Sequence, residues 1–153
     1  MTARAAAAGW LRKNKGVFMK AIQEVQKYMT TVPKSIGHDQ TISKASEIMK
    51  SMHMRHLPVL KGAQLIGVLT ERDISFILQF QEVNPDEMKV EEACTLDPYF
   101  TSPQAPLNEV VSRMAEKKYS CALIVDNSKL VGIFTEIDAY KALSDLLETR
   151  LKH

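Results

Sequence analysis

Two stretches of the sequence decide the fold, LIGVLTERD at residues 65–73 and LVGIFTEID at residues 130–138. Asp73 corresponds to Asp138, so the two stretches lie 65 positions apart, and the same offset superimposes further identical residues without a gap. These further matches are the pairs Thr30 and Thr95, Pro33 and Pro98, and Met49 and Met114. Repetition at a constant period indicates two copies of one supersecondary unit. We therefore expect one small architecture built twice.

The hydrophobic pattern assigns the same elements to both copies. An apolar stripe at helical spacing comes first, over 42–52 in one copy and over 107–114 in the other. Two short apolar runs separated by turn residues follow and predict a β-hairpin in each copy. The runs cover 57–60 and 65–69 in the first copy, and 122–125 and 130–134 in the second. Each copy closes with a predicted helix, over 71–80 and over 136–151.

These elements predict the α+β class, with two βαββα repeats packed around pseudo-twofold symmetry. A repeat with three short strands cannot bury its apolar face alone, so the two sheets are expected to pack against each other. A helix over 19–29 is expected to lead into the first repeat. The predicted segments are an N-terminal leader and helix at 1–27, a first repeat at 28–83, a linker at 84–93, a second repeat at 94–149 and a C-terminal tail at 150–153.

Composition narrows the class of protein. The chain has 153 residues, 45% of them hydrophobic, and a net charge of +2, which indicates a globular protein and argues against nucleic acid or a membrane surface as the main partner. Cys94 and Cys121 lack the spacing of metal ligands and predict reduced thiols in a cytoplasmic protein. No apolar stretch approaches the length of a membrane helix.

Residues 1–18 differ from the rest of the chain, because they contain four basic residues and no acidic one. Three interpretations stay open for this segment. It is a disordered or non-native leader ahead of a natural start at Met19, an amphipathic helix that binds a partner, or an organelle transit peptide.

Several strings of the sequence resemble the CBS family, which is named after cystathionine β-synthase and whose tandem pairs are called Bateman modules. The resemblance covers residues 28–149. Its carriers are YMTTVP at 28–33, RHLPV at 55–59, LIGVLTERDI at 65–74 and LVGIFTEID at 130–138. The resemblance implies a regulatory module that binds an adenine nucleotide (AMP, ADP or ATP) between its repeats. It also implies a homodimer, or a separate regulated protein, as the partner that receives the signal.

Each copy places a Thr-x-x-Asp motif where its last strand meets its last helix. By itself the motif predicts a capping box, in which Thr70 or Thr135 caps the helix and Asp73 or Asp138 binds the N-cap amide. A carboxylate at such a corner can also accept hydrogen bonds from both hydroxyls of a ribose. In the CBS family these positions contact ribose and phosphate. We expect both roles, so all four residues are candidate ligand contacts.

An adenine ring needs an apolar slot with backbone groups at its edge. The resemblance places such slots at Ser35, Ile36 and Pro58 in the first copy, and at Phe100, Thr101 and Leu123 in the second. Packing in the core is the alternative role for these residues. Phe100 in particular either stacks on a base or packs in the core.

Phosphate groups require positive charge, which the two copies supply unequally. The first copy has Arg55, His56 and Arg72. The corresponding positions of the second copy hold no cation and are Ser120, Cys121 and Ile137. In the CBS family, a basic residue of one repeat can contact a ligand in the cleft of the other repeat, so Arg55 and His56 are candidates for either cleft. A role as solvated surface residues is the alternative. We therefore expect at least one competent nucleotide site, and not two.

Catalysis finds little support in the sequence. It contains no nucleophile elbow and no glycine-rich phosphate loop. His53 and His56 lie close in sequence, but they are expected on opposite sides of a helix end, and no third metal ligand is evident. The sequence therefore predicts neither an enzyme nor a metal site. Two alternatives to nucleotide sensing stay open, a dimerisation module with vestigial clefts and a sensor of S-adenosylmethionine.

Apolar residues on the closing helices exceed what a small repeat needs to bury. Such residues predict a surface for a homodimer. They are Ile74, Ile77, Leu78 and Phe80 in the first copy and residues 143–147 in the second.

Overall fold

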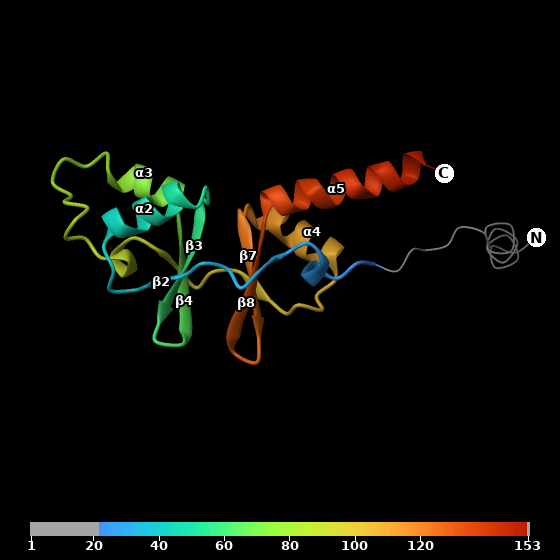
Figure 1. Ribbon diagram of the computed structural model, residues 1–153, viewed down its shortest axis with the longest axis horizontal. Helices are drawn as coiled ribbons and strands as arrows, with labels where there is room; N and C mark the ends of the chain where they lie inside the picture. Colours follow the sequence, from blue (N-terminus) through green and yellow to red (C-terminus); the bar gives the residue numbers. More distant parts are fainter. Residues whose placement is uncertain (1–21, 153) are drawn as a thin grey trace, which may run out of the picture.

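The computed structural model describes residues 22–152 and has two similar halves, each with a four-stranded sheet and two helices (Figure 1). The strands are β1 Thr30–Thr31, β2 Ile36–Gly37, β3 His56–Lys61, β4 Gln64–Thr70, β5 Thr95–Leu96, β6 Phe100–Thr101, β7 Cys121–Asp126 and β8 Lys129–Thr135. The helices are α2 Ile42–Ser51, α3 Glu71–Ile77, α4 Leu107–Lys117 and α5 Glu136–Leu151, with the 3₁₀ turns η1 Val25–Lys27 and η2 Val90–Glu92. The predicted α+β fold with two repeats is confirmed.

A long hairpin forms the centre of each sheet, β3–β4 in the first half and β7–β8 in the second. Each hairpin has one register shift, at Val59 in the first and, 65 positions later, at Ile124 in the second. The turns match as well, because Gly62 and Asn127 have positive φ angles of 61° and 47°. Glycine and asparagine tolerate this left-handed conformation best. The sequence repeat is therefore also a repeat of backbone geometry.

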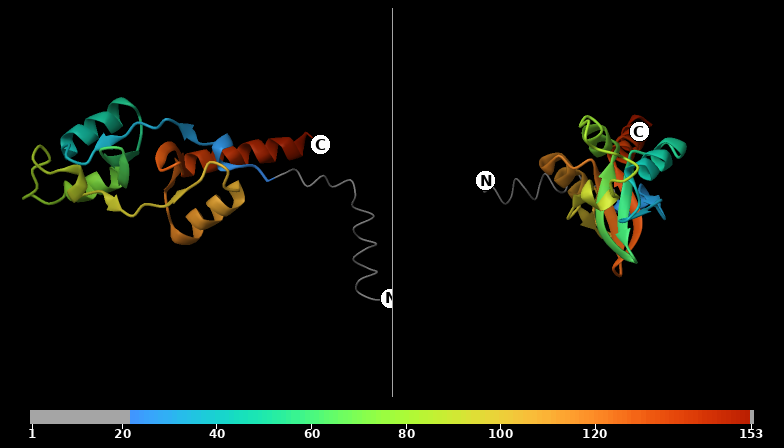
Figure 2. Two further views of the ribbon diagram at one scale, coloured as in Figure 1. Left: turned by 90° about the horizontal axis from the view of Figure 1, so that it is seen from below. Right: turned by 90° about the vertical axis from the view of Figure 1, so that its left-hand side faces the viewer.

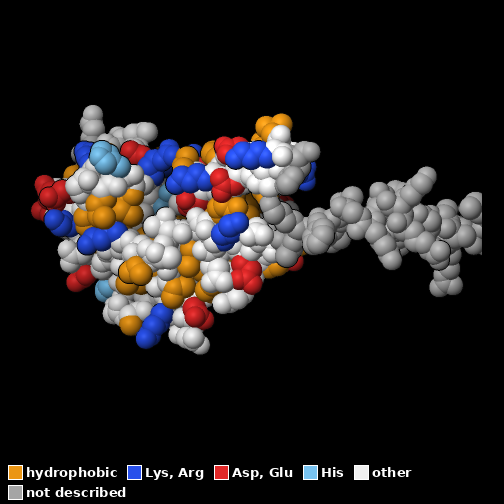
Figure 3. All heavy atoms as spheres, turned by 45° about the vertical axis from the view of Figure 1, so that its right-hand side comes forward, with side chains coloured by type: hydrophobic (Ala, Val, Ile, Leu, Met, Phe, Trp, Pro, Cys, Tyr) orange, Lys and Arg blue, Asp and Glu red, His pale blue; other side chains and the backbone are white. Residues whose placement is uncertain are grey.

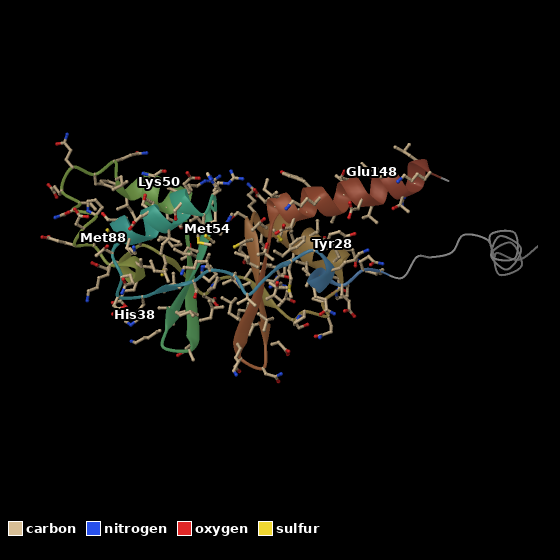
Figure 4. All side chains as sticks on the ribbon, viewed as in Figure 1. Tyr28, His38, Lys50, Met54, Met88 and Glu148 are labelled. Carbon is tan, nitrogen blue, oxygen red and sulfur yellow. The ribbon has the colours of Figure 1, made fainter. Side chains whose placement is uncertain are left out.

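The first strand of each repeat crosses into the sheet of the other repeat. β1 pairs with β8 and β5 pairs with β4, so the sheet orders are β1-β8-β7-β6 and β2-β3-β4-β5. The chain changes sheet directly after β1 and β5, where Val32 and Asp97 have positive φ angles of 45° and 56°. Tyr28, labelled in Figure 4, accordingly packs against the core of the second half although it belongs to the first repeat in sequence. Backbone pairing therefore ties the two repeats together.

Glycine residues in β4 and β8 make this crossing possible. A Cβ atom added at Gly67 would lie 2.6 Å from the Thr95 carbonyl oxygen. A Cβ atom at Gly132 would overlap the Met29 side chain. The backbone of β5 therefore approaches β4 more closely than a larger residue at Gly67 allows, whereas at Gly132 only a flexible side chain would have to move.

Three clusters of buried side chains hold the fold together. One cluster lies under α2 and α3, and a second lies under α4 and α5. Each fully buried large side chain, such as Leu57 or Phe134, stabilises the folded state by about 1.5–3 kcal/mol. The third cluster joins the two sheets and consists of Val68, Cys121, Leu123 and Ile133. Figures 1 and 2 show the sheets at the centre and the helices of each half outside them. The predicted packing of sheet against sheet is confirmed.

The helix expected over 19–29 is wrong where the structure describes it. Only the 3₁₀ turn η1 forms there. The Val25 amide donates to the Ala105 carbonyl at 2.9 Å, and the Leu107 amide donates to the Gln23 carbonyl at 2.7 Å. The segment is therefore held by bonds to residues around the start of α4, and its own helical bonds are limited to the single turn at η1. Residues 1–18, for which three interpretations were open, lie outside the described residues.

The first closing helix is shorter than expected. α3 ends at Ile77 rather than at residue 80, and separate turns follow, in which Phe80 and Val83 donate their amides to the carbonyls of Ile77 and Phe80. The second closing helix, α5, has the predicted bounds. Ile74 was expected on the dimer surface, but it is buried in the first core because its side chain faces the sheet. Among residues 22–152, no helix is both long and apolar enough to cross a membrane.

Candidate functional site

The two Thr-x-x-Asp corners form the capping boxes that the sequence predicts. The Thr70 amide and hydroxyl both donate to Asp73 Oδ2, each at 2.8 Å. The Thr135 amide and hydroxyl donate to Asp138 Oδ2 at 2.9 Å and 3.0 Å. One oxygen of each carboxylate is therefore occupied by the helix start, and only the other is available to a ligand.

The second carboxylate oxygens of the two corners differ. Asp138 Oδ1 lies 3.7 Å from the Lys141 ammonium, and the Asp138 side chain is only 9% exposed. In the part of the chain that the structure describes, Asp73 Oδ1 has no protein partner, and Asp73 is more exposed than Asp138. The first corner therefore offers the more accessible acceptor.

His56 joins the two repeats beside these corners. It begins β3, and its Nε2 lies 2.9 Å from the hydroxyl oxygen of Ser120, the residue before β7. Backbone hydrogen bonds hold the residues before β3 and β7 against the helix starts. The Glu71 amide donates to the Arg55 carbonyl at 3.0 Å, and the Glu136 amide donates to the Ser120 carbonyl at 3.2 Å. Arg55 and Ser120 thus stand beside the starts of α3 and α5.

The electrostatic surroundings of His56 come from both repeats. Burial lowers the pKa of His56 below its usual 6.5, and the Arg55 guanidinium lowers it further. The carboxylates of Glu136, Asp73 and Asp138 act on this pKa in the opposite direction. Acidic groups of α3 and of α5 therefore both face one imidazole, which is neutral at neutral pH. The carboxylates of both corners therefore lie within electrostatic range of the same imidazole.

The residues predicted for the adenine slots lie on neighbouring strands. Parallel pairing sets Ile36 opposite Val59, next to Pro58, and sets Phe100 opposite Leu123. Pro58 and Leu123 are fully buried, whereas Phe100 is 59% exposed. Ser35 and Thr101 are half-buried. The exposure of Phe100 excludes core packing for this ring and leaves its face open to a ligand.

The family model for the CBS domain matches this chain twice, over residues 22–79 and residues 90–145. The chain belongs to the CBS domain family. Each matched range contains one of the Thr-x-x-Asp corners, so the CBS pair has one corner in each domain.

Two curated relatives illustrate the range of proteins that resemble this CBS pair. Inosine-5'-monophosphate dehydrogenase of Staphylococcus haemolyticus is 28% identical over 151 residues, which are 92% of this chain and 30% of the dehydrogenase. CBS domain-containing protein YhcV of Bacillus subtilis is 30% identical over 112 residues, which are 73% of this chain and 79% of that protein. The chain thus spans less than a third of the dehydrogenases that it matches.

Two solved structures share the fold of this CBS pair. The CBS domain pair of MJ0100, in complex with 5'-methylthioadenosine and S-adenosyl-L-methionine, has a TM-score of 0.70 and 23% identity, and the match covers 79% of this chain and 99% of that one. CBSX2 in complex with AMP has a TM-score of 0.69 and 21% identity, with 80% and 97% of the chains covered. At these identities the likeness is one of fold.

The sequence reasoning missed an aromatic pair beside the second slot of the CBS pair. Tyr99 and Tyr119 stack with ring centroids 5.4 Å apart, and the Arg113 guanidinium lies 5.3 Å from the centroid of the Tyr99 ring. With Phe100 these side chains line a hollow of about 760 Å³. The flank of the second repeat therefore has an aromatic surface of a kind that stacks on planar groups.

The corresponding positions of the first repeat hold Lys34 and Met54. Met54, labelled in Figure 4, lies near the junction of the two halves and packs against the first core. The sequence did place Tyr99 next to Phe100 and Tyr119 next to Ser120. Only the pairing of β6 with β7 brings the two tyrosines together.

The arginines that the sequence predicts for phosphate binding are exposed in the structure. These are Arg55 and Arg72, and among residues 22–152 neither of them forms an ion pair. In Figure 3, basic side chains lie along the upper edge of the molecule among acidic and hydrophobic ones. Within the described residues, no group of three or more His, Cys, Asp and Glu side chains is placed to hold a metal ion.

Proposed function

We propose that this CBS pair is a regulatory sensor that binds an adenine nucleotide, AMP, ADP or ATP, between its two repeats. The observation that carries the proposal is the junction at His56, which bonds to Ser120 across the two repeats and lies within electrostatic range of the carboxylates of both corners and of the Arg55 cation. A nucleotide combines a ribose diol, which suits a carboxylate, with a phosphate, which suits a cation. The junction supplies partners for both groups.

The first corner supports this proposal more strongly than the second. Asp73 Oδ1 has no protein partner among residues 22–152 and is available to ribose hydroxyls. Arg55 and Arg72 are exposed and available to phosphate oxygens. We propose that Ser35, Ile36 and Pro58, or Phe100, Thr101 and Leu123, hold the base. We expect one competent nucleotide site rather than two.

The ligands of similar proteins are consistent with an adenosine-containing compound. CBSX2 was solved with AMP, and the CBS pair of MJ0100 was solved with 5'-methylthioadenosine and S-adenosyl-L-methionine. S-adenosylmethionine is therefore the second candidate. The corner of Asp138 favours it, because that corner has a carboxylate but Ser120, Cys121 and Ile137 in place of phosphate cations.

We propose that the bound nucleotide is read out through the oligomer of this chain or through a separate regulated protein. Large hydrophobic side chains are exposed on α3, on α5 and just after α3. They are Phe76, Leu78 and Phe80 in the first half and Tyr140, Leu143, Leu146, Leu147 and Leu151 in the second. Exposed apolar residues in such number support a homodimer. A nucleotide that binds one packing of that dimer more tightly shifts the population towards it.

A thermal-shift panel tests the proposal with AMP, ADP, ATP, S-adenosylmethionine, GTP and NADH. At a hundredfold excess over its dissociation constant, a ligand that binds only the folded chain stabilises it by about 2.7 kcal/mol. We expect a rise in Tm with an adenine nucleotide and its loss in Asp73→Asn. This variant removes the charge but retains an oxygen that can accept the Thr70 hydrogen bonds, and Asp138→Asn is the matched variant of the second corner.

The panel also separates the alternatives. A rise with S-adenosylmethionine alone that survives Arg55→Ala would replace nucleotide sensing with sensing of that compound. No rise with any ligand, in protein shown to be folded, would leave a dimerisation module with vestigial clefts.

A further inference from the structure

The hydrogen bond between His56 and Ser120 is unusual within this molecule. Among residues 22–152, it is the single side-chain hydrogen bond that joins the β3–β4 half to the β7–β8 half. The equivalent positions in the repeats are Arg55 for Ser120 and Cys121 for His56, so the bond has no counterpart across the pseudo-twofold axis. The junction therefore has a titratable base on one side only.

The charges that face this imidazole come from every element around it. Arg55 stands before β3, Asp73 lies on α3, and Glu136 and Asp138 lie on α5. Burial and Arg55 favour the neutral ring in the free protein, and the carboxylates only partly oppose them. A phosphate dianion at this junction adds negative charge beside the ring and favours the protonated form.

Resting on the proposed function, we propose that His56 is a specificity-determining residue that selects phosphate-bearing ligands by taking up a proton when they bind. In the free protein the neutral ring is bonded to Ser120. When a nucleotide phosphate enters, the imidazole takes a proton from solvent and becomes a second cation beside Arg55. A ligand without phosphate, such as adenosine, does not induce this uptake.

The second repeat cannot perform the same exchange. Burial raises the pKa of the Cys121 thiol to about 12, so this group stays neutral over the physiological range. A thiol is also never a cation in either of its protonation states. Proton-linked selection of phosphate is therefore a property of the His56 side of the junction.

Isothermal titration calorimetry in two buffers of different ionisation enthalpy measures the protons taken up on binding. AMP is the phosphate-bearing probe and adenosine is the control ligand. Titrations between about pH 7 and pH 8 keep at least about 90% of the phosphate in its doubly ionised form, because its second pKa is about 6. For wild-type protein we expect net proton uptake with AMP and tighter AMP binding at the lower pH, by at most about tenfold per pH unit for one proton. Adenosine should show neither effect.

Two variants assign the proton to one residue. His56→Gln keeps a side chain that can hydrogen-bond to Ser120 but cannot be protonated, so AMP should bind it more weakly and without proton uptake. His53→Asn is the matched control, since His53 is exposed and has a φ of 52°, a conformation that asparagine tolerates. This control should retain the uptake of the wild type. The ring ¹⁵N shifts of His56 should report its protonation directly when AMP is added.

The outcomes separate this inference from the proposed function. AMP binding with the same proton uptake in His56→Gln as in wild type would overturn the inference and leave nucleotide sensing intact. Equal pH dependence for AMP and adenosine would also overturn it. Failure of AMP, ADP, ATP and adenosine to bind folded wild-type protein would reject the proposed function itself, and the role of His56 with it.

Discussion

The first and second repeats of this CBS pair share their backbone, but they differ in the side chains that face the junction. Positive φ angles recur at equivalent positions, for example 52° at His53 and 58° at Lys118. The residues beside the corners differ, because Arg55 in the first repeat corresponds to Ser120 in the second. The repeat is thus maintained in the chain path and in the Thr-x-x-Asp corners, and it is lost in the basic residues beside those corners. A pair of equal folds therefore does not imply a pair of equal sites.

Removal of the Arg55 cation is the strongest test of the chemical difference between the first and second repeats. We expect Arg55→Ala to weaken AMP binding about 10- to 100-fold, because a charge-assisted hydrogen bond contributes about 1.5–3 kcal/mol. Adenosine binding should change little. Ser120→Ala is the matched variant in the second repeat and removes only a neutral hydrogen bond. Equal losses in the two variants, measured by calorimetry, would contradict the assignment of the phosphate to the first repeat.

The two crossing glycines test how alike the backbones are. Gly67→Ala should destabilise the fold by about 1–3 kcal/mol, since the added Cβ meets the Thr95 carbonyl oxygen, which belongs to the backbone. Gly132→Ala should cost less than about 1 kcal/mol, because the Met29 side chain that it meets can rotate away. Urea denaturation measures both values. A larger loss for Gly132→Ala would show that the second crossing is the tighter one.

The crossover residues Val32 and Asp97 offer a test of backbone strain. A β-branched residue at positive φ is disfavoured, whereas aspartate and asparagine tolerate it. Val32 is 88% exposed, so little burial is lost when it is replaced. We expect Val32→Asn to stabilise the protein by about 1 kcal/mol and Asp97→Val to destabilise it by about as much. Thermal unfolding with opposite signs for the two variants would support this; a neutral Val32→Asn would not.

The equivalent positions His56 and Cys121 should give stability opposite dependences on pH. The lowered pKa of His56 means that its contribution is present above the usual 6.5 and is lost as pH falls through the folded-state value. The raised pKa of Cys121 means that its contribution is present below 9.0 and is lost as pH rises towards about 12. His56→Gln should flatten the acid side of a plot of Tm against pH, and Cys121→Ala the alkaline side. Unchanged profiles in both variants would contradict these origins.

Much of the fold follows from the sequence, because the pattern that defines it is local. Both hairpins, the bounds of α5 and the capping of α3 by Thr70 come from residues close together in the chain, and the offset of 65 follows from comparing two such local patterns. The crossing of β1 and β5 into opposite sheets does not. Hydrophobic periodicity identifies a strand but not its partner, and the partners of these strands are distant in sequence.

The candidate site also has a part that could be predicted from the sequence and a part that could not. The two aspartates and Arg55 were predictable from motif and charge. The hydrogen bond from His56 to Ser120 and the stacking of Tyr99 on Tyr119 depend on how the two repeats and their strands pack. The expected exposure of Ile74 was wrong for a related reason, because a rotation of a fraction of a turn about the axis of a short helix decides which side chain faces the sheet.

The stoichiometry of AMP binding tests the central claim most directly. A calorimetric titration of AMP into the purified CBS pair should give about one site per chain, and that site should be lost in Asp73→Asn or Arg55→Ala while the protein stays folded. Two equal sites per chain would contradict the inequality of the repeats. No binding of AMP, and none of ADP or ATP in the same titration, would contradict nucleotide sensing.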